Sequence, residues 1–156
     1  MQDIWTRNEV VQILDIARAS LLKCEQEGLL SPTMKLPNKE RSRPLYDFKK
    51  LSAYFLYVQL KSDKGYLEKK SYEPLSIVNK LVEDEKSLNA KYLLVFEDKA
   101  IFTWTDREFV EAMTSNTDFI GFVDWQAHLQ LLIERIETVF PNDDRNDVAQ
   151  KELVAC

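Results

Sequence analysis

The sequence predicts a mostly helical α+β protein, and three observations lead to this fold class. Apolar residues recur at helical spacing near the N-terminus and again over residues 125–140. Residues 92–96 and 100–105 are rich in aromatic and branched side chains, and the three residues between them predict a β-hairpin. Pro32, Pro37 and Pro44 interrupt a basic segment, which excludes a helix there but allows a short β-ribbon.

Two short helices are predicted at the N-terminus, with a tight turn between them. Thr6 suits an N-cap, and Glu9, three residues later, completes a capping box. A second helix is expected to begin near Asp15 and to stop at Gly28, because glycine suits a left-handed helix end. After the ribbon, a further helix is expected to begin at Tyr46-Asp47.

The remainder of the chain is predicted to form a small α/β segment. Proline is tolerated in the first turn of a helix, so Glu73-Pro74 is expected to open one. After the hairpin, the expected elements are a short helix from a cap at Thr105 or Asp106 to Ser115, a strand over 119–123, and a long amphipathic helix that Asp124 caps and Pro141 ends.

The charge distribution divides the chain into two parts. Residues 1–71 carry 13 basic and 9 acidic side chains, whereas residues 72–156 carry 8 basic and 17 acidic ones. We therefore expect a basic binding domain over 1–70, an acidic α/β dimerisation or effector domain over 71–141, and a polar, flexible tail over 142–156.

Several function classes are not supported by the composition. The three glycines are too far apart for a phosphate-binding loop, and the longest stretch without a charged residue has ten residues, too few for a membrane span. The first seven residues include an acidic side chain, where a signal peptide has a basic and then an apolar stretch, which favours a cytoplasmic protein. With only two cysteines, a disulfide framework is not expected. A single histidine, His128, favours a structural role over a metal site or a catalytic triad, so we expect no enzyme activity, metal or cofactor.

The order helix, turn, helix, basic ribbon, helix is that of a winged helix-turn-helix. Residues 16–30, which end in Glu25-Gln26-Glu27-Gly28-Leu29-Leu30, resemble the recognition helix of the MerR family of transcriptional regulators. Leu45-Tyr46, followed by Leu51, is similar to the family's pattern after the wing. The resemblance covers about residues 4–61. It implies a DNA-binding transcription regulator that places its second helix in the major groove of double-stranded DNA and its ribbon against phosphates.

Basic and polar side chains of the second helix and the ribbon are the expected DNA contacts. Those near the start of the helix suit bases or phosphates, and those of the ribbon suit phosphates. The alternatives are a solvated surface and an acidic protein partner. The predicted residues are Arg18, Ser20, Lys23, Lys35, Lys39, Arg41 and Arg43.

Surplus apolar surface on the last predicted helix favours a homodimer, which suits a two-fold DNA site. The predicted contact residues are Trp125, Leu129, Leu132, Ile133, Ile136 and Phe140. The aromatic residues of the C-terminal half are expected to fill its core more than to line a ligand pocket. Cys24 is expected to be a small core residue and not a redox sensor.

A second hypothesis comes from departures from the MerR pattern. The family usually has arginine where this chain has Leu22, and an aromatic pair where it has Lys23 and Cys24. These positions contact DNA in the family. The alternative is a non-enzymatic adaptor with a degenerate helix-turn-helix, whose apolar C-terminal surface recruits a protein partner.

Overall fold

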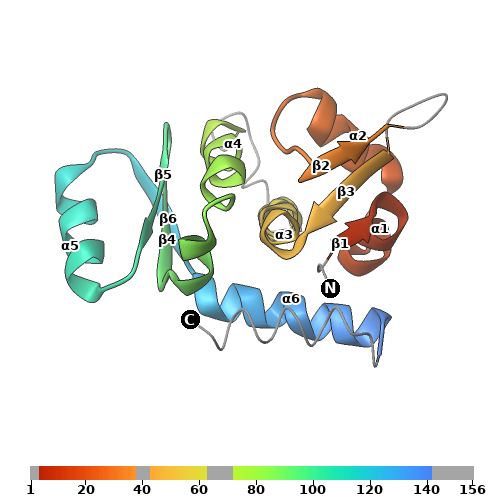
Figure 1. Ribbon diagram of the computed structural model, residues 1–156. Coiled ribbons are helices and arrows are strands. Elements are labelled where there is room, and N and C mark those ends of the chain that lie inside the picture. The colour runs from red at the N-terminus through yellow and green to blue at the C-terminus, as the bar shows by residue number, and fades with distance from the viewer. Residues whose placement is uncertain (1–3, 38–42, 63–71, 142–156) are drawn as a thin grey trace.

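The computed structural model describes residues 4–37, 43–62 and 72–141. The protein is α+β and mostly helical, which confirms the predicted class. Two antiparallel sheets of three strands each lie toward opposite ends of the molecule, and helices lie between them (Figure 1). The predicted tail over 142–156 lies outside the described residues.

The N-terminal half contains the predicted helix pair and ribbon. Its elements are β1 (Ile4–Thr6), α1 (Arg7–Leu14), α2 (Arg18–Gln26), β2 (Met34–Leu36), β3 (Arg43–Asp47) and α3 (Phe48–Ser62). The strand order is β1-β3-β2. Thr6 caps α1 and Glu9 completes the capping box, as predicted.

Two predicted helix starts need correction. Asp15 does not open α2: it adopts a left-handed conformation (φ 53°) that ends α1, and α2 begins at Arg18. Tyr46 and Asp47 belong to β3, because Tyr46 pairs with Trp5 of β1. The Asp47 carboxylate instead accepts a 2.8 Å hydrogen bond from the backbone N–H of Lys50, in the first turn of α3.

The C-terminal half follows the predicted order closely. Its elements are α4 (Tyr72–Leu81), the 3₁₀ helix η2 (Glu85–Asn89), β4 (Tyr92–Phe96), β5 (Ala100–Thr103), α5 (Asp106–Ser115), β6 (Phe119–Asp124) and α6 (Trp125–Val139). The hairpin β4–β5 is confirmed, and β6 adds the third strand in the order β5-β4-β6. Thr105 caps α5 and Asp124 caps α6.

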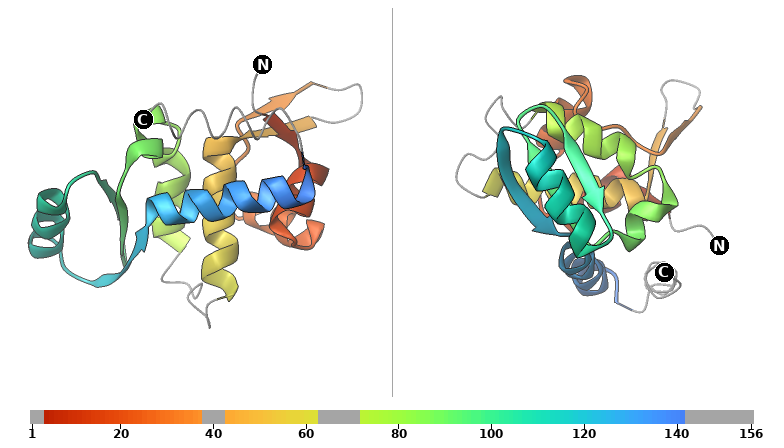
Figure 2. Two further views of the ribbon diagram at one scale, coloured as in Figure 1. Left: turned by 90° about the horizontal axis from the view of Figure 1, so that it is seen from below. Right: turned by 90° about the vertical axis from the view of Figure 1, so that its left-hand side faces the viewer.

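One hydrophobic core joins the two halves. Helix α6 crosses α3 and continues to α1 (Figure 2), so that buried residues from β1 to α6 form a single cluster. The buried ammonium group of Lys50 adds a polar link, because it donates 2.8 Å hydrogen bonds to the Asn79 carbonyl of α4 and to the Glu83 carboxylate. The division at residue 70 therefore separates two stretches of sequence that share one core.

The predicted dimer contact also needs correction. Most of its residues point into the chain's own core, where α6 packs on α1 and α3. They are covered within one chain and are not available to a second copy. The buried residues are Trp125, Leu129, Leu132, Ile133 and Ile136, while Phe140 is half-buried against the same core.

His128 has the structural role that the sequence predicts. Its ring stacks between Phe55 and Trp125, at centroid distances of 4.8 and 4.9 Å. Its Nε2 lies 3.1 Å from the Ser52 carbonyl, which can only accept, so Nε2–H is the donor. Burial lowers the pKa of His128 to about 4 and keeps the imidazole neutral at pH 7.

Candidate nucleic-acid interface

Helix α2 has one buried face and one exposed face. Leu21 and Cys24 are buried in the core, and Cys24 is the small core residue that the sequence predicts. Burial raises the pKa of the Cys24 thiol, which keeps it protonated and unreactive. Arg18 and Lys23 lie on the exposed face, and Ser20 is half-buried.

A carboxylate at the centre of a hydrogen-bond network fixes the orientation of α2. Glu25 Oε1 accepts a 2.6 Å hydrogen bond from the Arg7 guanidinium of α1. Glu25 Oε2 accepts hydrogen bonds from the hydroxyl groups of Tyr46 in β3, at 2.6 Å, and Tyr54 in α3, at 2.8 Å. One residue of α2 thereby connects the helix to three other elements.

The two tyrosines of this network are held in their neutral, donating form. Burial, together with the nearby Glu25 carboxylate, raises the pKa of Tyr46 and of Tyr54 well above the usual value. The two rings also meet edge to face, with centroids 5.2 Å apart. The network therefore combines charge-assisted hydrogen bonds with aromatic packing between β3 and α3.

Arg18 is positioned by a residue that the sequence did not indicate. Its guanidinium donates a 2.6 Å hydrogen bond to the side-chain oxygen of Asn8, in the first turn of α1, and both residues are exposed. The contact holds the arginine at the N-terminal end of α2. Ten residues separate the pair along the chain, and no spacing rule for a single helix predicts such a contact.

The ribbon β2–β3 carries two more of the cations predicted to contact DNA, Lys35 and Arg43. Lys35 lies opposite Pro44 and Leu36 lies opposite Arg43 in the antiparallel register, and both cations are exposed. The base of the ribbon is closed by a 2.8 Å hydrogen bond, which the backbone N–H of Asp47, the last residue of β3, donates to Thr33 Oγ1, just before β2. Lys39 and Arg41, which the sequence also predicts as contacts, lie outside the described residues.

Helix α2 and the ribbon lie at the same end of the molecule, opposite the β4–β6 sheet and α5 (Figure 1). The ribbon projects away from the helical body (Figure 2). The structure thus brings together at one end the five predicted contact residues that it describes, Arg18, Ser20, Lys23, Lys35 and Arg43. One exposed acid, Glu27, follows the C-terminal end of α2.

Comparison with known proteins assigns no family to this chain. No protein-family model matches the sequence, and the search of curated proteins also finds no match. Within residues 4–37, 43–62 and 72–141, no group of three or more His, Cys, Asp or Glu side chains is placed to hold a metal ion. Over the same residues, every helix is too short or too polar to cross a membrane.

Proposed function

We propose that this protein binds double-stranded DNA through a winged helix-turn-helix, with α2 as the recognition helix and β2–β3 as the wing. The residues that carry the resemblance to the MerR family extend the proposal to transcription regulation. Arg18, Ser20 and Lys23 contact the duplex from α2, while Lys35, Lys39, Arg41 and Arg43 contact phosphates from the wing. The proposed activity is non-enzymatic.

The observation that carries this proposal is the orientation of α2. Its buried face and Glu25 are fixed to α1, β3 and α3, which leaves the side chains of Arg18 and Lys23 exposed to solvent. Recognition helices read DNA mainly with residues near their N-termini, and Arg18 is the first residue of α2. A rigid helix with an arginine at this end therefore suits a major groove.

The charge distribution supports one orientation on DNA. The chain carries a net charge of −5, but its acidic excess lies in residues 72–156. Of this stretch, the β4–β6 sheet and α5 lie at the end of the molecule opposite α2 and the wing (Figure 1). Phosphates attract the basic end and repel the acidic end, so the overall field favours approach with α2 and the wing forward. Lys23 occupies a position where the MerR family usually has an aromatic residue. We therefore expect this protein to prefer different bases from those that the family prefers.

Selection from a random duplex library tests the proposal. The full chain is expected to enrich a defined sequence motif over several rounds, and an Arg18→Ala/Lys23→Ala variant is expected to enrich none. A Lys86→Ala/Arg107→Ala variant is the matched control, because it removes the same charge from exposed positions on η2 and α5. Failure of the full chain to enrich any motif, or equal enrichment by the α2 variant, contradicts sequence-specific DNA binding.

A further inference from the structure

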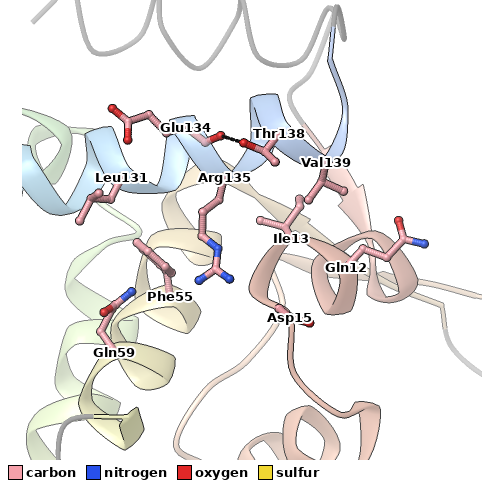
Figure 3. Close-up of a pocket in the computed structure, with 10 residues that line it drawn as sticks. All are labelled: Gln12, Ile13, Asp15, Phe55, Gln59, Leu131, Glu134, Arg135, Thr138 and Val139. Carbon is pink, nitrogen blue, oxygen red and sulfur yellow. Dashed lines mark hydrogen bonds between the residues drawn. The ribbon is translucent and has the colours of Figure 1, made fainter.

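A groove of about 580 Å³ lies between α1, α3 and α6 (Figure 3). Its apolar lining comes from three elements: Ile13 of α1, Phe55 of α3, and Leu131 and Val139 of α6. This volume is within the range of small-molecule sites, which are mostly apolar with a few polar groups that orient the ligand. The groove is separate from the exposed face of α2 and from the wing.

A single cation projects into this groove. The Arg135 side chain extends from α6 toward α3 (Figure 3), and its guanidinium carbon lies 5.7 Å from the centre of the Phe55 ring. Among the carboxylates that the structure describes, none forms an ion pair with Arg135. The guanidinium fork therefore remains available for a planar anion.

The remaining lining residues restrict the charge of the ligand. The Glu134 carboxylate points to the other side of α6, away from Arg135 (Figure 3), while Asp15 lines the groove at the end of α1. A second anionic group on the ligand would meet Asp15. The amide group of Gln12 adds a neutral polar contact. The lining therefore favours a ligand that has one negatively charged group and is otherwise apolar.

We propose that this groove binds a small amphipathic monocarboxylate. The ligand carboxylate pairs with the Arg135 guanidinium, and its aromatic or branched apolar part packs on Leu131 and on the half-buried Val139. Leu131 is 51% exposed, and a ligand in this position would cover it. The proposal stands independently of DNA binding.

Isothermal titration calorimetry of the full chain tests this site with two probes of equal shape. 1-Naphthoate carries the carboxylate, and 1-naphthamide has the same ring system without charge. We expect saturable binding of one naphthoate per chain and at least about tenfold weaker binding of the amide, because hydrogen bonds to charged groups are stronger. Equal affinity for the two probes, or no saturable binding of naphthoate, overturns the proposal.

Two variants locate the site on the molecule. Arg135→Gln is expected to reduce naphthoate affinity to that of the amide, whereas Arg107→Gln on α5 leaves it unchanged. Leu131→Glu puts a negative charge on an exposed lining position and is expected to weaken naphthoate binding at least about tenfold by repulsion. Circular dichroism verifies folding, and Leu131→Glu decides the matter if Arg135→Gln is unfolded. Unchanged naphthoate binding in the folded variants overturns the proposal.

Discussion

The hydroxyl group of Tyr54 in α3 donates a 2.8 Å hydrogen bond to the Glu25 carboxylate of α2. The same carboxylate oxygen accepts a hydrogen bond from Tyr46, and the other oxygen accepts one from Arg7. The orientation of the proposed recognition helix therefore depends on a side chain that is mostly covered and points into the protein. The DNA contacts proposed for the exposed side chains of Arg18 and Lys23 depend on this orientation.

Replacing Glu25 is expected to destabilise the fold. Glu25→Ala leaves two buried hydroxyl groups and the Arg7 guanidinium without their acceptor, which costs roughly 2–4 kcal/mol in the free energy of unfolding. Urea denaturation measures this loss. Glu27→Ala, two residues later at an exposed position, is the matched control and is expected to change the free energy by less than about 0.5 kcal/mol. Equal effects of the two substitutions would show that the network does not stabilise the fold.

Stability is expected to fall as the pH drops below about 6.5, because of His128. Its folded-state pKa, about 4, lies below the unfolded value, so the unfolded chain binds more protons between these two pKa values. The stabilisation is fully present above pH 6.5 and is lost as the pH falls toward 4. Urea denaturation at pH 7.5 and pH 5.5 is expected to differ by about 1 kcal/mol from this residue.

The control for this effect is straightforward because His128 is the sole histidine of the chain. His128→Gln removes the titrating imidazole, and the stability difference between pH 7.5 and pH 5.5 is expected to shrink by that same amount. The quantity to compare is the difference in stability between the two pH values, in each protein. The loss of packing between Phe55 and Trp125 lowers stability at both pH values and cancels in this difference, whereas the effect of titration does not. A variant with an unchanged pH dependence would rule out a depressed pKa for His128.

The shared core predicts that the two halves unfold together. Leu132→Ala opens a cavity where α6 packs in the core and is expected to cost roughly 2–5 kcal/mol. Tryptophan fluorescence and far-ultraviolet circular dichroism are expected to report one coincident transition, shifted to lower urea in the variant. Leu131→Ala, at the adjacent exposed position, is expected to have little effect. Two separate transitions would support independent domains instead.

Local signals in the sequence predicted much of the secondary structure. The capping box at Thr6 and Glu9, the hairpin β4–β5, and the caps at Thr105 and Asp124 are all confirmed. Each depends on residues within a few positions of one another, so its physical cause is visible in the sequence. The helix starts near Asp15 and Tyr46 were displaced because a left-handed cap and a strand pairing decided them.

The same local sequence signals do not predict tertiary contacts. An apolar stripe on residues 125–140 shows that one face of a helix is covered, but it does not show whether a second copy or the same chain covers it. Glu25 lies in a charged stretch and looks like a solvated side chain until β3 and α3 bring two tyrosines to it. The contact of Arg18 with Asn8 likewise depends on how two helices meet.

The central claim is that α2 and the wing contact the phosphates and bases of duplex DNA. Fluorescence anisotropy of a labelled duplex across a salt series tests it most directly, with the full chain and an Arg18→Ala/Lys35→Ala/Arg43→Ala variant. Since each phosphate contact contributes about 0.9 to the slope of log affinity against log salt, losing three contacts reduces the slope by up to about 2.7. A Lys86→Ala/Lys91→Ala/Arg107→Ala variant is expected to keep the slope of the full chain. Equal slopes for all three proteins, or no binding at low salt, would contradict the claim.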